Sequence, residues 1–136
     1  MRQNKFSEKE LQVREWVKRA EDDELSIKAI LKEGGAFSTA CFLSQQMAEK
    51  YLKAFLIYYK EWYPKIHPLD TLWELCREIN KSFDEIKEDS VFLTTFYVAT
   101  RYPGDYPEFT SQEAQKSFKA AKRIKELVLN KFKNKK

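Results

Sequence analysis

The segment RYPGDYPEF, residues 101–109, concentrates side chains that can do chemistry in a chain that otherwise has helical periodicity. It holds one guanidinium group, two phenols and the last glycine of the protein. One interpretation is the mouth of a site. The other is a connection between helices, because Arg101 as a cation suits the carbonyl end of a helix dipole and Pro103 stops that helix.

Two further groups of polar residues fall within helical segments. Asp23 lies on an apolar stripe, so it must be paired if it is buried; a helix–helix hydrogen bond or ion pair is the structural alternative to a functional role. Gln46, Glu49 and Lys53 follow one polar edge of the run QQMAEKYLKA, which is also an ordinary solvated helix face.

The remaining reactive side chains exclude several classes of site. His67 is the one histidine and stands in a loop before Pro68, so paired Glu-x-x-His ligands of a di-iron bundle are excluded. Cys41 and Cys76 form no CxxC motif and occupy apolar helical positions, which favours buried thiols over zinc ligands or a disulfide. The sequence holds neither a glycine-rich phosphate loop nor a Gly-x-Ser-x-Gly motif. We therefore expect no metal and no cofactor.

Composition indicates one soluble domain spanning residues 1–136. Apolar residues make up 43% and charged residues 34% of the 136 residues. The net charge of +4 resides in the last six residues, KFKNKK, so residues 131–136 are expected to form a frayed, lysine-rich tail rather than a nucleic-acid contact. No apolar run suits a membrane span or a secretory signal, so the default localisation is cytoplasmic.

Hydrophobic periodicity places these residues on helices. Apolar residues recur at steps of three and four, and the few glycines and prolines divide the chain into helical segments. The longest stripe runs from Phe37 to about Lys60, which predicts a central helix. We predict an all-α, up-and-down four-helix bundle with one additional short helix. The apolar stripes cover residues 13–31, 37–58, 69–83 and 114–132, and a further helix is expected from Ser82 to Thr100.

Local signals predict where these helices start and stop. Gly34 and Gly35 end the first helix. Capping-box spacing occurs at Thr71–Glu74, at Ser82–Glu85 and at Thr110–Glu113, where Phe109 and Ala114 can form a hydrophobic staple. The fourth helix is expected to break near Asp89–Ser90.

In combination these features resemble the HEPN family of small prokaryotic helical domains. The resemblance rests first on Ala20-x-x-Asp23, the Gly34–Gly35 break and the helix ACFLSQQMAEKYLKA. It continues with His67 followed by Leu69 and Leu72, and with Tyr97 before Arg101-Tyr102-Pro103. These motifs occur in the family's order along nearly the whole chain.

The resemblance implies a helical bundle that commonly forms a homodimer. In many HEPN proteins an arginine, four to six residues and a histidine form a metal-independent ribonuclease site at the dimer interface. The histidine acts as a base on the RNA 2′-hydroxyl, and the arginine stabilises phosphate charge. Small HEPN proteins are also often encoded beside a minimal nucleotidyltransferase, as toxin and antitoxin.

This sequence departs from that pattern at the histidine. The corresponding positions after Arg101 hold Tyr106, Pro107 and Glu108. A tyrosine titrates near 10 and a proline exchanges no proton, so a general base worth about 100- to 10,000-fold in rate is missing. The resemblance therefore implies phosphate or nucleotide binding at Arg101, with Tyr102 and Tyr106 beside it.

Three hypotheses follow from the sequence. The first is a non-catalytic or weakly active HEPN protein that binds nucleotide or RNA phosphate and pairs with a minimal nucleotidyltransferase. The second is an active ribonuclease toxin that uses Arg101 with Tyr106, Asp105 or His67. The third is a structural adaptor in which Arg101 pairs with Asp23 or Glu49. The first is the leading hypothesis, because the family pattern is nearly complete and the catalytic histidine is absent.

Overall fold

The computed structural model describes residues 6–65, 68–99 and 109–133 of the chain. These residues form α-helices and one short 3-10 helix, and no strand occurs within these ranges. The prediction of an all-α fold is therefore confirmed. The elements are α1 (Glu8–Glu33), α2 (Phe37–Lys60), α3 (Leu69–Ile79), the 3-10 helix η1 (Lys81–Ile86), α4 (Lys87–Ala99) and α5 (Ser111–Lys133).

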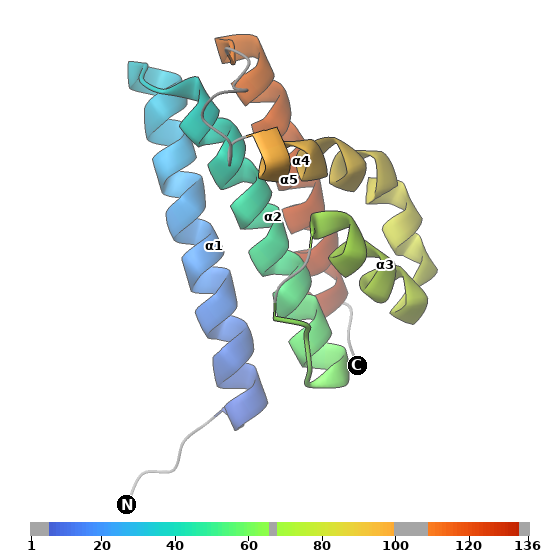
Figure 1. The fold of residues 1–136 in the computed structure, drawn as a ribbon. Coiled ribbons are helices and arrows are strands. Elements are labelled where there is room, and N and C mark those ends of the chain that lie inside the picture. Colours follow the sequence, from blue (N-terminus) through green and yellow to red (C-terminus); the bar gives the residue numbers. More distant parts are fainter. Residues whose placement is uncertain (1–5, 66–67, 100–108, 134–136) are drawn as a thin grey trace, which may run out of the picture.

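Helix α2 is the centre of the bundle. It packs against α1, α3, α4 and α5. Figure 1 shows α1 and α2 side by side and antiparallel, α5 running in the same direction as α2, and α3 and α4 on the side of α2 away from α1. Every residue from Tyr51 to Leu56 is buried, including Lys53, which is 8% exposed. The predicted central position of the segment 37–60 is confirmed.

The predicted apolar stripes form one main core. Ile27 of α1, Phe55 of α2, Leu72 of α3, Leu93 of α4 and Ile124 of α5 are all buried in it. Ile27, Phe55, Leu72 and Ile124 lie on predicted stripes, so the 3.6-residue period assigns the inner face of these four helices. No stripe was predicted for the helix that contains Leu93. The aromatic rings of Phe55 and Phe83, with centroids 4.5 Å apart, join α2 to η1 within this core.

The ends of α1 are fixed by local chemistry. Gly34 and Gly35 have φ angles of 90° and 143°, values that favour glycine, and the Gly34 amide donates to the Ile30 carbonyl at 2.8 Å. At the start, Ser7 and Glu10 form a capping box, each side chain accepting from the other's backbone amide. The glycine stop was predicted. The capping box was not predicted, although Ser7 and Glu10 have the Ser-x-x-Glu spacing of a capping box.

Two of the predicted helix starts are wrong. Helix α3 begins at Leu69 with Pro68 at the N-cap, so Thr71 and Glu74 lie inside the helix and form no capping box. Proline suits this boundary because its φ is already fixed near the required value. The segment from Ser82 is not the first turn of the fourth α-helix but η1, which is capped by Asn80 accepting from the Ser82 amide at 3.0 Å.

Helix α4 is continuous where a break was expected. It begins at Lys87 and runs through Asp89 and Ser90. An acidic residue is favourable in the first turn of a helix, and Asp89 in addition forms a two-hydrogen-bond ion pair with Arg123 of α5, at 2.7 and 3.0 Å. The pair therefore joins α4 to α5 at the position where the local sequence suggests a break.

Helix α5 begins as predicted and includes the start of the segment that was expected to fray. The Thr110 hydroxyl accepts from the Glu113 amide at 3.1 Å, and Glu113 accepts from the Thr110 amide at 3.0 Å. Phe109 packs against the core cluster that contains Ala114. The helix then continues to Lys133, so residues 131–133 are helical rather than frayed, and Phe132 packs on Tyr58 with ring centroids 5.0 Å apart.

Both cysteines are free, buried thiols, as their apolar helical positions predict. Burial raises the pKa of Cys41 and holds the pKa of Cys76 well above its usual value. A hydrogen bond with Ser117 lowers the Cys41 pKa in part. These thiols are packing residues of low reactivity. Among the described residues, no helix is both long and apolar enough to cross a bilayer.

We predict that Thr110→Ala lowers the free energy of unfolding by about 1 kcal/mol, because the Glu113 amide loses its capping acceptor. Chemical denaturation measures the change. Thr110→Ser retains the hydroxyl and is the matched control, expected to stay within a few tenths of a kcal/mol of the parent. Equal losses in both variants would contradict a role for the capping box.

Candidate functional site

A set of polar side chains is enclosed on α2, and we call Gln45, Gln46, Glu49 and Lys53 the polar stripe. Glu49 is its centre. One carboxylate oxygen accepts from the Gln46 amide at 3.3 Å and from the Gln45 amide at 3.5 Å, while the other pairs with the Lys53 ammonium at 3.0 Å. Gln46 also donates to Gln45 at 2.8 Å. Helical spacing of three and four residues makes this network possible within one helix.

The polar stripe is buried rather than solvated. Gln45 is fully buried, and the side chains of Lys53 and Glu49 are 10% and 15% exposed. The Lys53 ammonium lies 5.0 Å from the ring centroid of Trp16 on α1 and 5.3 Å from that of Tyr63, which follows α2. Two aromatic faces and one carboxylate therefore replace water around this cation.

Asp23 forms the helix–helix ion pair that its position on an apolar stripe suggested. Its carboxylate accepts from the Lys50 ammonium at 2.6 Å, joining α1 to α2, with both side chains mostly buried. One residue on, Glu24 pairs with Lys125 of α5 at 2.9 Å and with Lys28 at 3.6 Å. Charged residues thus connect α1 to both of its neighbouring helices.

The contacts limit what this region can do chemically. Both oxygens of Glu49 are engaged, and the charge of Lys53 is balanced within the stripe. A general base needs a free lone pair aimed at a substrate proton, and an anion site needs an uncompensated cation. The polar stripe offers neither in this arrangement, and its evident physical effect is to fix α2 against α1.

The residues proposed for anion binding and catalysis lie outside the described part of the chain. These are His67, Arg101, Tyr102, Asp105 and Tyr106.

The residues that flank segment 100–108 are described. Phe96 of α4 and Phe109 before α5 have ring centroids 5.5 Å apart in an edge-to-face arrangement. Helices α4 and α5 therefore approach each other where the segment with Arg101 connects them.

The described residues provide no cluster of metal ligands. Within residues 6–65, 68–99 and 109–133, no three histidine, cysteine, aspartate or glutamate side chains gather in a way that would hold an ion.

The sequence-based prediction missed several residues of this region or their roles. Lys125 meets Glu24 across 101 positions of the chain, a distance at which no local pattern operates. Trp16 was assigned to the core stripe without a role toward Lys53. Gln45 was within the run QQMAEKYLKA, and its i, i+4 spacing to Glu49 was the available signal.

These features together define a class: a single bundle with a buried polar stripe on its central helix and a short proline-rich connection before its last helix. The sequence matches the HEPN domain family over residues 13–132. The chain therefore belongs to the HEPN domain family.

Solved structures have the same fold. The chain is similar to TT1696 from Thermus thermophilus, with 25% sequence identity, a TM-score of 0.79 and coverage of 88% of this chain and 98% of that one. It is also similar to ST0689, an archaeal HEPN homologue, with 29% identity, a TM-score of 0.70 and coverage of 88% and 96%. A search of the curated proteins gave no match.

We predict that Lys53→Met lowers the free energy of unfolding by about 2 to 3 kcal/mol, because it leaves the Glu49 carboxylate buried without its cation. The double variant Glu49→Gln/Lys53→Met should lose less than the single one, which denaturant titration of both will measure. Lys18→Met removes an exposed pair of the same spacing with Asp22 and should cost well under about 1 kcal/mol. Similar losses for Lys53→Met and Lys18→Met would contradict the buried pair.

Proposed function

We propose that this HEPN-domain protein binds the phosphate of a nucleotide or of RNA through Arg101, with Tyr102 and Tyr106 beside it, and cleaves RNA weakly or not at all. The observation that carries the proposal is the segment RYPGDYPEF, which keeps the family's arginine and has no histidine four to six residues later. An arginine that lacks the general base still provides the charge-assisted hydrogen bonds that phosphate requires.

The ion pairs of the bundle support this proposal over the structural adaptor. That hypothesis assigned Arg101 to Asp23 or Glu49. Lysines already satisfy both carboxylates, Lys50 for Asp23 and Lys53 for Glu49. Asp23 and Glu49 therefore each have a cationic partner without Arg101.

The first test is binding of a fluorescein-labelled single-stranded RNA and of ATP. We expect Arg101→Ala to weaken the binding that the parent shows by at least about tenfold, because a phosphate loses its charged donor. Arg19→Ala is the matched control, since Arg19 is exposed on α1 and pairs only with Glu15 among the described residues. Incubation with the labelled RNA in the absence of divalent metal measures cleavage in the same samples.

Two results would overturn the proposal. RNA cleavage by the parent that Arg101→Ala abolishes would establish the ribonuclease, with Tyr106, Asp105 or His67 as candidates for the missing base. Absence of binding to both RNA and ATP, together with a lowered melting temperature for Arg101→Ala, would favour the adaptor.

We further propose that the protein acts as a homodimer in the cytoplasm and pairs with a minimal nucleotidyltransferase in a toxin–antitoxin-type system. Membership of the HEPN family supports this partner, because small members are often encoded beside such an enzyme. We expect a dimer in analytical ultracentrifugation and co-elution with the nucleotidyltransferase encoded by the adjacent gene. A monomer at micromolar concentration, or an adjacent enzyme that elutes separately, would contradict the assembly.

A further inference from the structure

The three most exposed aromatic side chains of the described residues lie at one end of the bundle. They are Phe6 before α1, Tyr59 in the last turn of α2 and Trp62 just after that helix, which are 39%, 40% and 57% exposed. Contacts join the helix ends there, because Lys9 of α1 lies over the ring of Tyr58 and that ring packs on Phe132 of α5. Figure 1 shows the start of α1 and the ends of α2 and α5 together. We call this surface the aromatic end.

Local structure presents Tyr59 and Trp62 to solvent. The ring of Tyr59 packs on Phe55 and Tyr58, with centroids 4.6 and 5.0 Å apart, so its orientation is fixed in the free protein. Glu61 ends α2 in the left-handed conformation, with a φ angle of 58°, and Trp62 leaves the helix after it. This conformation is strained for a residue other than glycine, and such strain concentrates at functional positions.

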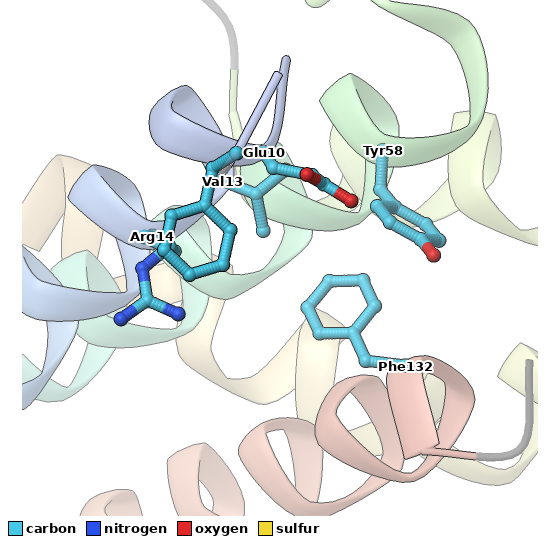
Figure 2. A pocket seen from close by; sticks show the side chains of 6 residues that line it. Glu10, Val13, Arg14, Tyr58 and Phe132 are labelled. Atoms are coloured by element: carbon cyan, nitrogen blue, oxygen red, sulfur yellow. The ribbon is translucent and has the colours of Figure 1, made fainter. Parts of the chain in front are cut away.

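A hollow of about 210 Å³ opens between the helix ends. Figure 2 shows Tyr58 and Phe132 across this hollow from Val13 and Arg14. Phe6 is a third aromatic residue in its lining, which also includes the acid Glu10. Because one acid and one guanidinium line it together, the hollow itself selects neither sign of charge. Its aromatic walls suit a flat, uncharged ring.

The cations around the aromatic end are not neutralised by ion pairs. Residues 8–14, the last turn of α2 with Glu61, and the last turn of α5 hold five cations and three acids, which leaves an excess of two positive charges. None of the five pairs with an acid in the part of the chain that the structure describes. The cations are Lys9, Arg14, Lys60, Lys131 and Lys133, and the acids are Glu8, Glu10 and Glu61.

The end of α5 holds part of the lysine-rich tail beside these rings. The net charge of +4 resides in residues 131–136, which the sequence suggested would fray and make no nucleic-acid contact. Lys131 and Lys133 instead belong to α5 and flank Phe132, whose ring centroid lies 5.0 Å from that of Tyr58. A positioned charge loses less conformational freedom on binding than a frayed one. The reason for excluding a nucleic-acid contact therefore does not hold for these two lysines.

We propose that the aromatic end binds a single-stranded nucleic acid. Its bases stack on the rings of Tyr59 and Trp62, and its phosphates meet Lys60, Lys131 and Lys133. Exposed rings next to unpaired cations are what a single strand requires, because its bases are uncovered and its backbone is anionic. The site uses none of the residues proposed above for phosphate binding, so it can be tested in a chain that lacks Arg101.

The test uses a fluorescein-labelled oligothymidylate of about 12 nucleotides, which has no 2′-hydroxyl to be cleaved and no self-complementary sequence. Every variant is made in the Arg101→Ala background, so that the phosphate site proposed at Arg101 does not contribute. We expect fluorescence anisotropy to show that the single strand binds at least about fivefold more tightly than a duplex of the same length, because the duplex covers its base faces. The affinity should fall as salt is added.

Matched variants separate stacking from apolar contact and from charge. Trp62→Leu keeps an apolar side chain without an aromatic face and should weaken binding at least about fivefold, whereas Trp62→Phe should stay within about threefold. Lys60→Gln should reduce the slope of log affinity against log salt concentration by about 0.7. Leu25→Ala and Lys32→Gln change exposed residues elsewhere on α1 and should leave the affinity unchanged. Trp62 and Lys60 are exposed, so their variants are expected to fold, as circular dichroism will verify.

Four outcomes would overturn the inference. Equal affinity of Trp62→Leu and Trp62→Phe, or of single strand and duplex, removes the stacking. Binding to phosphatidylserine vesicles without binding to the oligonucleotide identifies a lipid surface as the occupant. An oligonucleotide that binds the parent but not Arg101→Ala places the strand at Arg101, which leaves the proposed function intact and removes the aromatic end. Absence of binding to the parent as well removes the site.

Discussion

The burial of α2 on several sides is the constraint on which the rest of this structure depends. A helix surrounded by other helices cannot leave polar side chains unsatisfied, because desolvated amides and charges have no water to replace a missing partner. Gln45, Glu49 and Lys53 are nevertheless there. They are accommodated because each lies one turn from the next, so the helix itself supplies the partners.

Ion pairs between helices also supply partners for charges that the packing removes from water. Asp23–Lys50 joins α1 to α2, Glu24–Lys125 joins α1 to α5, and Asp89–Arg123 joins α4 to α5. Partly buried pairs of this kind contribute little net free energy beyond a hydrophobic replacement, but breaking one partner is costly. Their effect is to penalise alternative rotations of each helix. The ion pairs thus help to fix the orientation of α1, α2, α4 and α5 relative to one another.

Helix α5 connects two ends of the bundle. It begins at Ser111, after the segment of the sequence that contains Arg101, and its last turns contribute Leu129 and Phe132 to a pocket with α1. The two ends are joined by one core. The continuous packing from Ile27 to Ile124 through α2 provides that core.

Residue periodicity by itself determined the helices, their inner faces, the glycine stop at Gly34–Gly35 and the capped start at Thr110, because these depend on neighbours within one or two turns. The starts of α3 and α4 were predicted wrongly. Pro68 is the N-cap of α3, and Asn80 is the N-cap of η1, where the sequence also offered capping-box spacing at Thr71 and Ser82. The sequence also indicated the need to pair Asp23, without naming Lys50. Only the tertiary structure decided which cations meet Asp23 and Glu24, that Glu49 and Lys53 are buried, and that Leu129 and Phe132 of α5 line a pocket with α1. These outcomes depend on how helices distant in sequence pack around α2, and no local pattern encodes that packing.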